Sequence, residues 1–345
     1  MPLAGAENTG PAAEVGRELW LRADAHFGVI PPRARGRERA RKNLTSVSGT
    51  TAAHPAGRLR HRLRAAAGTH YARRVQTFAG KRVLITGGAS GIGRAIAERL
   101  VKEDAELLLV DVNAAGLAAT AEALGRGGAR VRTYQLDITD ASRIQGLRDE
   151  IHRDGGPIDV LVNNAGLVFG GAFLDVPVER HFTTYRVNTL GLVAMTHAFL
   201  PDLLTRPDAH VVNVASASGY VGLPFGATYA SSKWAVLGFT ESLALELELL
   251  GHRHVHVTVI CPSYVATGLF DGVAAPRTTR LLTPEHIADL TVRATLANER
   301  VVRTPLLVKL SPFLRGILPL PLFNRIASLL GVNTSMMHWR GRPPS

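Results

Sequence analysis

The chain has very little cysteine and no long uninterrupted apolar segment. Its one cysteine, Cys261, excludes an internal disulfide framework and a metal site built from several cysteines, and it suits a reducing compartment. No apolar run reaches the roughly 18 residues that span a bilayer. No apolar core of about 7–15 residues follows the amino terminus, as it would in a secretory signal. We therefore expect a cytoplasmic protein without a bound metal.

Acidic residues are scarce at the amino-terminal end of the chain. Residues 1–80 hold 14 of the 40 Lys and Arg residues but only 5 of the 28 Asp and Glu residues, so they carry +9 of the formal net charge of +12. The rest of the chain is nearly neutral. The basicity is therefore no sign of a nucleic-acid partner for the folded part.

Residues 1–77 are rich in Ala, Arg, Gly and Pro and have no sustained apolar period to bury. This composition predicts a disordered leader. It is compatible with an organelle-targeting peptide, with a basic arm for anionic surfaces, or with upstream sequence translated from a start codon set too early. We favour the third account, with Val75 as an alternative start, because the first strand-like run begins only at Lys81.

From Lys81 onward, apolar strand-like runs alternate with helical stretches. The strand-like runs cover residues 82–86, 106–111, 130–137, 159–165, 210–216 and 255–262, and the helical stretches include 91–103, 140–153 and 228–250. This alternation predicts the α/β class, with a single doubly wound (Rossmann) domain around a seven-stranded, mostly parallel sheet. We place this domain at residues 78–303 and an apolar extension at residues 304–345.

A glycine-rich stretch follows the first strand-like run and opens a helix. Gly87, Gly91 and Gly93 are spaced G-x-x-x-G-x-G, with Ser90 and Ile92 between them. Glycines at such a turn let the backbone approach a pyrophosphate, which the helix amino terminus then stabilises. The stretch therefore predicts a dinucleotide site.

Asp111 ends the second strand-like run, about 20 residues past the glycines. A carboxylate there accepts hydrogen bonds from the ribose hydroxyls of NAD and repels the 2′-phosphate of NADP. The alternative is a solvated Asp at a strand end. We expect NAD rather than NADP, with Asp137 and Ile138 near the adenine.

Tyr229 and Lys233 are spaced four residues apart in the stretch "TYASSKWAV". Residues at i and i+4 share a helix face, so an ammonium can lie beside a phenol. We expect Lys233 to lower the pKa of Tyr229, because a neighbouring cation favours the phenolate. Such a pair suits acid/base chemistry near neutral pH, although a solvated helix face has the same spacing.

Five motifs occur in a fixed order, "TGGASGIG", "NNAG" (163–166), "VN" (187–188), "NVASASG" (213–219) and "YASSK" (229–233). With these motifs the chain resembles the short-chain dehydrogenase/reductase family over roughly residues 78–310. The resemblance implies hydride transfer between an alcohol carbon and nicotinamide. It also implies a role for four side chains: Tyr229 as the acid/base, Lys233 as its partner and ribose ligand, Ser216 as the donor to the substrate oxygen, and Asn188 as the anchor of a water relay to Lys233.

The resemblance implies further cofactor contacts at Asn164, Ala165 and Gly166, and at Pro262 and Thr267 in "CPSYVATGLF". We also expect Asn163 and Gly166 to form the floor under the cofactor. Ser263 stands where the family usually has glycine, so the turn at this point is expected to differ.

Residues 304–332 are apolar, with Pro312, Pro319 and Pro321 and the basic residues Lys309, Arg315 and Arg325. This extension is similar to that of retinol dehydrogenases and 17β-hydroxysteroid dehydrogenases, which implies a lipophilic alcohol or carbonyl substrate. Two interpretations stay open. The segment is either a helix packed on the core or on a second copy in a homo-oligomer, or an interfacial segment that makes peripheral membrane contact and admits substrate.

Two other functions compete with a lipophilic alcohol dehydrogenase. One is an NADPH-dependent 3-ketoacyl-type reductase, and the other is a catalytically silent dinucleotide-binding protein with a basic recruiting arm. A silent protein has no need to retain Ser216, Tyr229, Lys233 and Asn188, so the sequence favours an enzyme.

Overall fold

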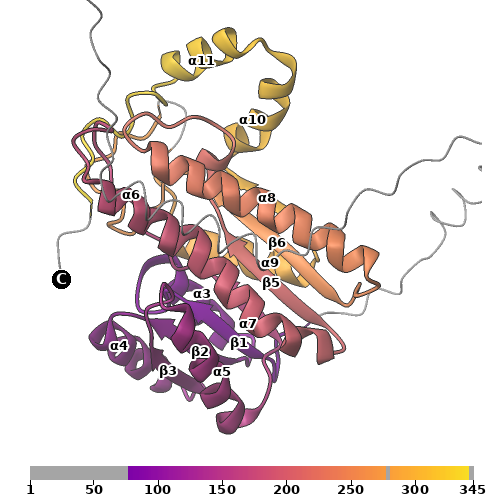
Figure 1. Cartoon of the computed structure of the whole chain (residues 1–345). Helices are drawn as coiled ribbons and strands as arrows, with labels where there is room; N and C mark the ends of the chain where they lie inside the picture. The colour runs from indigo at the N-terminus through magenta and orange to yellow at the C-terminus, as the bar shows by residue number, and fades with distance from the viewer. Residues whose placement is uncertain (1–76, 277–279, 342–345) are drawn as a thin grey trace, which may run out of the picture. The chain divides into compact units, whose positions relative to one another are not determined.

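The computed structural model describes residues 77–276 and 280–341, which are coloured by residue number in Figure 1. The predicted leader, residues 1–77, lies outside the described residues except for Thr77, so its disorder stays a prediction.

The domain is built on one seven-stranded sheet in the order β3-β2-β1-β4-β5-β6-β7, and every neighbouring pair is parallel. The six strand-like runs of the sequence are confirmed as β1 to β6, while the seventh strand, β7, had not been located. The strands are β1 (Arg82–Thr86), β2 (Glu106–Asp111), β3 (Val131–Gln135), β4 (Val160–Asn163), β5 (Ala209–Val214), β6 (Val255–Pro262) and β7 (Val301–Thr304).

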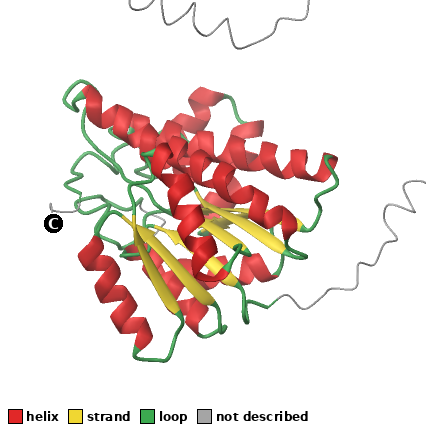
Figure 2. Ribbon diagram, turned by 60° about the horizontal axis from the view of Figure 1, so that its bottom comes forward, coloured by secondary structure: helices red, strands yellow, loops and turns green. Residues whose placement is uncertain are grey.

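Helices cover both faces of this sheet, as Figure 2 shows. On β1, Val83 and Ile85 pack in one core cluster and Leu84 packs in another, because successive side chains of a strand point to opposite faces. The first cluster also holds side chains of α3 (Gly91–Val101), α4 (Ala114–Gly125) and α9 (Pro284–Leu296). The second holds side chains of α5 (Ala141–Gly155), α7 (Leu192–Thr205) and α8 (Ala227–Leu249). Burial on both faces explains why the strands are continuously apolar.

Short polar side chains begin several of these helices. The side chain of Asn113 accepts a hydrogen bond from the Gly116 N–H at the start of α4, at 2.9 Å, and that of Thr283 accepts from the His286 N–H at the start of α9, at 3.2 Å. Asp140 does the same for α5. These contacts satisfy N–H groups that have no partner inside the helix.

The segment Val178–Thr205 is helical throughout, as α6 (Val178–Tyr185), a π-helical turn η1 (Arg186–Gly191) and α7. Within the described residues it is the one helical segment long and apolar enough to cross a membrane by length and composition. However, 44% of its apolar window is buried inside the domain. Its apolar character therefore fits a core helix of the α/β domain.

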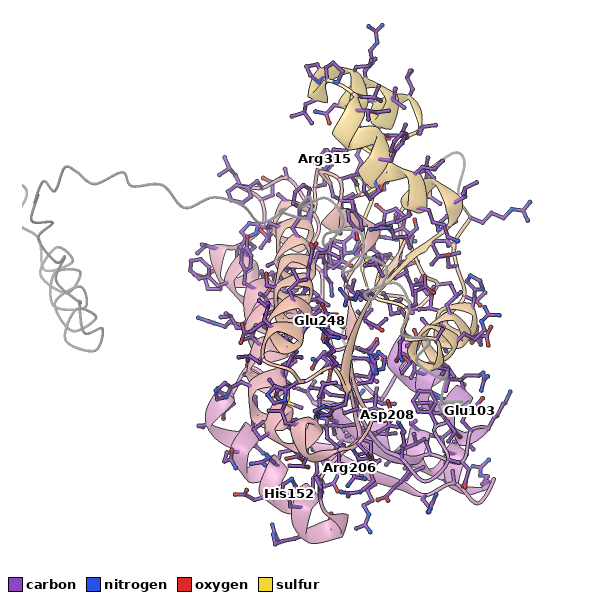
Figure 3. All side chains as sticks on the ribbon, turned by 90° about the vertical axis from the view of Figure 1, so that its right-hand side faces the viewer. Glu103, His152, Arg206, Asp208, Glu248 and Arg315 are labelled. Carbon is purple, nitrogen blue, oxygen red and sulfur yellow. The ribbon has the colours of Figure 1, made fainter. Side chains whose placement is uncertain are left out.

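The edge of the sheet at the amino ends of the strands is fixed by ion pairs. Arg206 donates to Asp159 at 2.6 Å, and Lys81 pairs with Asp208 at 2.5 Å. The carboxylate of Asp202, whose side chain has no exposed surface, accepts from Arg148 and contacts His152. Figure 3 shows His152, Arg206 and Asp208 at the end of the domain opposite to Arg315.

The C-terminal extension forms α10 (Leu306–Ile317) and α11 (Leu320–Leu329), which project from the α/β body in Figures 1 and 3. Pro319 is the N-cap of α11 at the break between the two helices, whereas Pro312 lies inside α10. Val308, Phe323 and Met336 are buried. Part of the extension therefore packs onto the domain, and a division of the chain at residue 303 stays a prediction.

Candidate functional site

A cavity of about 630 Å³ lies at the carboxyl ends of the strands. Its wall contains residues from the segments that directly follow β1, β2, β3, β4, β5 and β6. It spans the point between β1 and β4 where the strand order reverses. Open α/β sheets bind ligands in this position.

The glycine-rich turn closes one side of the cavity. Gly87 has φ +69° and Gly91 has φ +57°, a region that L side chains rarely adopt. A Cβ on Gly93 would lie 2.1 Å from the Gly87 carbonyl oxygen, and a Cβ on Gly87 would lie 2.8 Å from Asn164 Nδ2. The turn therefore needs glycine both for its conformation and for its close packing.

Asn164 ties the end of β4 to this turn. Its Nδ2 donates to the carbonyl oxygens of Thr86 at 3.0 Å and Gly87 at 3.2 Å. In return, Thr86 Oγ1 accepts from the N–H groups of Asn164 and Ala165. These bonds hold the walls on either side of the β1–β4 junction at a fixed separation.

Asp111 lines the cavity at the end of β2, as the sequence predicted. Its carboxylate also accepts from the Ala89 N–H at 3.1 Å and from the Asn113 N–H at 3.0 Å. Asp111 thus supports the glycine-rich turn as well as presenting negative charge to the cavity.

Most of the predicted cofactor residues meet in the wall of this one cavity. They are Gly87, Ser90, Gly91, Ile92, Asp111, Asp137, Ile138, Asn164, Ala165, Gly166, Tyr229, Lys233, Pro262 and Thr267.

Gly93 and Asn163 depart from the expected positions. Gly93 packs α3 beneath the turn instead of facing the cavity. The prediction that Asn163 forms the cavity floor is wrong, because its Nδ2 donates to Thr196 Oγ1 and Asn213 Oδ1, both at 2.9 Å. Asn163 is the last residue of a fully buried strand, and its side chain joins β4 to α7 and β5.

Tyr229 and Lys233 both come from the first turns of α8, and both are almost completely buried. Lys233 Nζ donates to the Val214 carbonyl oxygen at 2.9 Å and lies 5.9 Å from the centre of the Tyr229 ring. The i, i+4 spacing therefore does place the two groups together in the site.

The expected lowering of the Tyr229 pKa is wrong for the protein without cofactor. Burial raises the pKa of Tyr229 above the usual value of a phenol, and a hydrogen bond with Ser216 only partly opposes this. Burial disfavours the charged phenolate, and the lysine that was expected to offset this is aimed at Val214.

Burial acts on Lys233 in the opposite direction and lowers its pKa to about 8. A buried ammonium loses hydration, so the neutral amine is favoured. Lys233 therefore exchanges its proton close to neutral pH, where an exposed lysine stays charged.

Ser216 follows β5 and caps the short turn η2 (Ala217–Gly219), and its Oγ accepts from the Ser218 N–H at 3.1 Å. The same hydroxyl contacts Tyr229 through the hydrogen bond that affects the Tyr229 pKa. The structure thus brings Ser216 and Tyr229 together at the cavity wall.

Asn188 is fully buried in η1, where the π-helical turn interrupts the α-helix. Its Oδ1 accepts from the Leu167 N–H at 2.8 Å, and its Nδ2 donates to the Leu167 carbonyl oxygen and to Ser232 Oγ. A Cβ on Gly166 would lie 3.3 Å from Asn188 Oδ1 and 3.4 Å from Lys233 Nζ. Asn188 and Lys233 therefore flank Gly166, and π-helical turns of this kind are frequent at functional sites.

Several cavity residues were missed by the sequence reasoning. The wall also contains Val110, Val112, Leu136, Thr139, Leu167, Thr183, Arg186, Val187, Val214, Ala215, Ser263, Val265, Leu269 and Phe270. Many directly follow a strand, which is a usable signal. Thr183 and Arg186 come from a helix, and no pattern in the sequence marks them.

A second, smaller cavity of about 90 Å³ lies on the other side of Tyr229. It shares Ser216, Tyr229, Ser263 and Phe270 with the first. The rest of its wall is mostly apolar and consists of Ala217, Ser218, Val221, Leu223, Tyr264, Pro276, Leu307, Val308, Ser311 and Val332. Tyr229 and Ser216 thus stand between a large cavity and a small apolar one.

Metal-binding side chains are not clustered in the described ranges, where no group of three or more His, Cys, Asp or Glu is placed to hold an ion.

Comparisons with known proteins agree with this geometry. The sequence profile of the family described as short chain dehydrogenase matches residues 81–277. The chain belongs to the short-chain dehydrogenase family. It is 34% identical to 17-beta-hydroxysteroid dehydrogenase 13 of Mus musculus over 239 residues, which is 69% of this chain and 78% of the relative. It is 32% identical to epidermal retinol dehydrogenase 2 of Homo sapiens over 264 residues, 76% of this chain and 85% of the relative.

Among solved structures, the short-chain dehydrogenase of Burkholderia phymatum in complex with NAD superimposes with a TM-score of 0.65 and 28% identity, covering 70% of this chain and 94% of that one. This short-chain dehydrogenase is therefore an oxidoreductase that acts on CH–OH groups, with an NAD(P)-binding Rossmann fold.

The buried amine of Lys233 predicts a characteristic pH dependence of stability. Because its folded pKa of about 8 lies below the ordinary 10.5, the stability it contributes at high pH is lost as the pH falls towards 8. We expect Lys233→Met to remove up to about 1.4 kcal/mol per pH unit of this dependence between about pH 8 and 10. Urea unfolding across this range measures it. Lys309→Met, on an exposed lysine, is the control, and equal slopes in Lys233→Met and the parent contradict the account.

Proposed function

We propose that this short-chain dehydrogenase interconverts a lipophilic primary or secondary alcohol and its carbonyl compound, with NAD as the hydride carrier and Tyr229 as the acid/base. The observation that carries the proposal is the position of Tyr229 and Ser216. Both border the large cavity with its dinucleotide features and the small apolar cavity at the same time. If Ser216 and Tyr229 hold the oxygen of the substrate, the carbon bonded to that oxygen lies between the large and the small cavity.

The residues of the large cavity fit a dinucleotide. The glycine-rich turn leaves no room for a Cβ at Gly87 or Gly93, and it leads into the amino terminus of α3, where N–H groups suit a pyrophosphate. Thr267 lies against Gly91, on the side of the turn that faces the loop after β6. We assign the pyrophosphate to the turn, the adenosine to Asp111, Asp137 and Ile138, and the nicotinamide end to Lys233 and Thr267.

When bound, nicotinamide supplies or accepts the hydride, and the protein moves the remaining proton. In the reducing direction, Tyr229 Oη donates its proton to the carbonyl oxygen, and burial keeps the phenol protonated for this step. In the oxidising direction, Tyr229 first gives up its phenolic proton, and the resulting phenolate oxygen then takes the proton of the alcohol. The neutral amine of Lys233, whose pKa is lowered to about 8, is the neighbouring base that can take the phenolic proton, and Asn188 fixes the nearby backbone at Leu167.

The preference for NAD rests on Asp111. Its carboxylate lies in the cavity wall at the end of β2, where the ribose of the adenosine half is expected. A 2′-phosphate at this position would meet that negative charge. The same argument disfavours the NADPH-dependent 3-ketoacyl reductase as an alternative.

The role of Tyr229 is tested by Tyr229→Phe, which removes only the hydroxyl. We expect turnover to fall by about 10²–10⁴-fold, the usual contribution of general acid/base catalysis, while the Kd for NADH changes little. Tyr185→Phe is the matched control, because Tyr185 lies on α6 and bonds Ser231 away from both cavities. Activity of Tyr229→Phe above roughly a tenth of the parent argues against the assignment.

The role of Asp111 is tested by Asp111→Asn. This change removes the charge but keeps the shape of the side chain and an oxygen that can accept from the Ala89 N–H. We expect the ratio of kcat/KM for NAD to that for NADP to fall by roughly tenfold or more, equivalent to about 1.4 kcal/mol. Asp149→Asn, on the exposed face of α5 and outside both cavities, serves as the control. An unchanged ratio means that Asp111 does not face the ribose.

The lipophilic nature of the substrate is supported by the small cavity. Its wall includes Leu307 and Val308 of α10 together with Val221, Leu223 and Phe270. An apolar wall favours burial of apolar substrate atoms. A panel of retinol, estradiol, decan-2-ol and a 3-ketoacyl thioester, each with NAD(H) and NADP(H), separates this substrate class from the acyl-type alternative.

We include peripheral membrane contact in the proposal, through the outer surface of α10 and α11. Phe313 is 65% exposed, and Leu306, Leu310, Ile317, Leu320, Leu322 and Leu329 are exposed as well. The sequence beyond Glu299 contains no Asp or Glu, so the charged side chains that this segment itself contributes to the surface are basic. Apolar side chains flanked by cations suit a membrane with anionic lipids.

Two residues of this extension, Arg315 and Phe323, do not lie on its exposed surface. Arg315 turns inward, where its guanidinium stacks 4.4 Å from the centre of the Trp234 ring and donates to the Tyr220 carbonyl oxygen at 2.9 Å. Phe323 is only 7% exposed and belongs to the packed side of α11. The exposed residues of an amphipathic helix depend on which face packs onto the domain. The sequences of these short helices do not show which face that is.

Homo-oligomerisation also stays a proposal. It is supported by exposed apolar side chains on the neighbouring helices α6, η1 and α8, namely Phe182, Tyr185, Leu190, Trp234 and Leu245.

The membrane contact is tested by replacing Leu310, Phe313 and Ile317 of α10 with Ser. We expect weaker sedimentation with phosphatidylcholine–phosphatidylserine vesicles and a higher KM for decan-2-ol, while KM for cyclohexanol is kept. The control replaces the exposed Leu174, Leu249 and Leu250 with Ser. If the α10 variant binds vesicles like the parent, or if it dissociates an oligomer, the surface has another role.

A further inference from the structure

Two segments far apart in the sequence meet beside Tyr229. We call residues 263–276, which follow β6, the substrate loop, and residues 331–341, near the carboxyl terminus, the C-terminal strap. The substrate loop contributes Ser263, Tyr264, Phe270 and Pro276 to the small cavity. The contacts that hold this loop in place therefore help to set the shape of the small cavity.

The C-terminal strap binds the substrate loop at several points along its length. The Trp339 indole N–H donates to the Leu269 carbonyl oxygen at 3.1 Å, and the Arg340 backbone N–H donates to the Asp271 carbonyl oxygen at 2.8 Å. The Ala274 N–H donates to the Ser335 carbonyl oxygen at 3.1 Å. These bonds fix the distal part of the loop.

A pair of hydroxyl groups joins the strap to the start of the loop. Tyr264 Oη and Ser335 Oγ lie 2.6 Å apart, and Ser335 is only 1% exposed. Ser335 Oγ also donates to the Val332 carbonyl oxygen at 2.7 Å. A serine hydroxyl has one proton, so Tyr264 must be the donor in the bond between them.

Tyr264 transmits this attachment to Tyr229 through Phe270. The Phe270 ring makes edge-to-face contacts with Tyr264, at 5.1 Å between ring centres, and with Tyr229, at 5.6 Å. From the strap side, the neighbouring Met336 is buried in one cluster with Tyr229 and Leu223. Both Ser335 and Met336 thus act on the same side of the site.

We propose that Tyr264 and Ser335 are positioning residues that set the substrate cavity, by holding Phe270 and Tyr264 itself at the distance from Tyr229 that a lipophilic alcohol requires. This inference rests on the proposed function for the nature of the substrate. Neither residue borders the large cavity. Tyr264 borders only the small cavity, whereas Phe270 borders both, so the bond should act mainly on the alcohol and much less on the dinucleotide.

The test uses Ser335→Ala and Tyr264→Phe in the full chain, with Ser335→Thr as the conservative variant. We expect KM for decan-2-ol, and the Kd for retinol read from its fluorescence, to rise roughly three- to tenfold in the first two variants, the effect of one ordinary hydrogen bond. The Kd for NADH should stay unchanged, and kcat should change less than KM, because a positioning contact contributes to binding of the substrate. Ser335→Thr keeps a hydroxyl at this position and should give values close to those of the parent.

The double variant Ser335→Ala/Tyr264→Phe should be no worse than either single variant, because both remove the same bond. Thr334→Val is the matched control, since it removes an exposed hydroxyl one residue earlier that bonds only Gly331 among the described residues. Hydrogen exchange should be faster in residues 263–276 in both single variants and unchanged in Thr334→Val.

The outcomes separate this inference from the proposed function. If the parent oxidises none of the alcohols, the proposed function fails, and the Kd for retinol together with the exchange rates still decides the positioning role. The inference is overturned if KM and the retinol Kd stay within twofold of the parent, if the two substitutions multiply in their effects, or if NADH binding weakens in parallel.

Discussion

The packing of α8 across the carboxyl end of β5 is the constraint on which the rest of the site depends. Lys233 of α8 donates to the carbonyl oxygen of Val214, the last residue of β5, and Ser216 lies two residues farther along the same chain. Because Tyr229 is one helical turn before Lys233, this single contact sets its position relative to Ser216. The parallel sheet makes the arrangement possible, since it gathers the carboxyl ends of all its strands at one edge.

The same packing takes polar groups out of water, and this determines their protonation. Burial raises the pKa of Tyr229 and lowers that of Lys233 to about 8, so the phenol stays neutral and Lys233 loses its proton more readily than an exposed lysine. Such a site lowers the free energy of unfolding at neutral pH, because the buried amine of Lys233 binds a proton less tightly in the folded than in the unfolded protein. In return it contains a phenol that keeps its proton until a carbonyl oxygen can take it, and an amine whose pKa of about 8 is closer to neutral pH than that of an exposed lysine.

Local patterns in the sequence were sufficient to locate the elements that local interactions determine. The alternation of apolar runs located β1 to β6, and the glycine spacing located the turn before α3. The pattern failed where a long-range contact decides. The edge strand β7, VVRT, has buried residues only at alternate positions and so lacks a continuous apolar run. Asn163 faces α7 instead of the cavity, and Arg315 stacks on Trp234. Tyr264 and Ser335 are 71 residues apart in the sequence, so no local spacing pattern predicts their contact.

The central claim, hydride transfer from a lipophilic alcohol with Tyr229 as the base, is tested most directly by following the hydrogen itself. Decan-2-ol deuterated at C2 is incubated with NAD and the protein, and the nicotinamide product is examined by mass spectrometry. The account predicts deuterium at C4 of the nicotinamide with the parent protein and with Tyr185→Phe, and at least about 10²-fold less of it with Tyr229→Phe. Reduced nicotinamide without deuterium, or equal transfer in Tyr229→Phe, would contradict it.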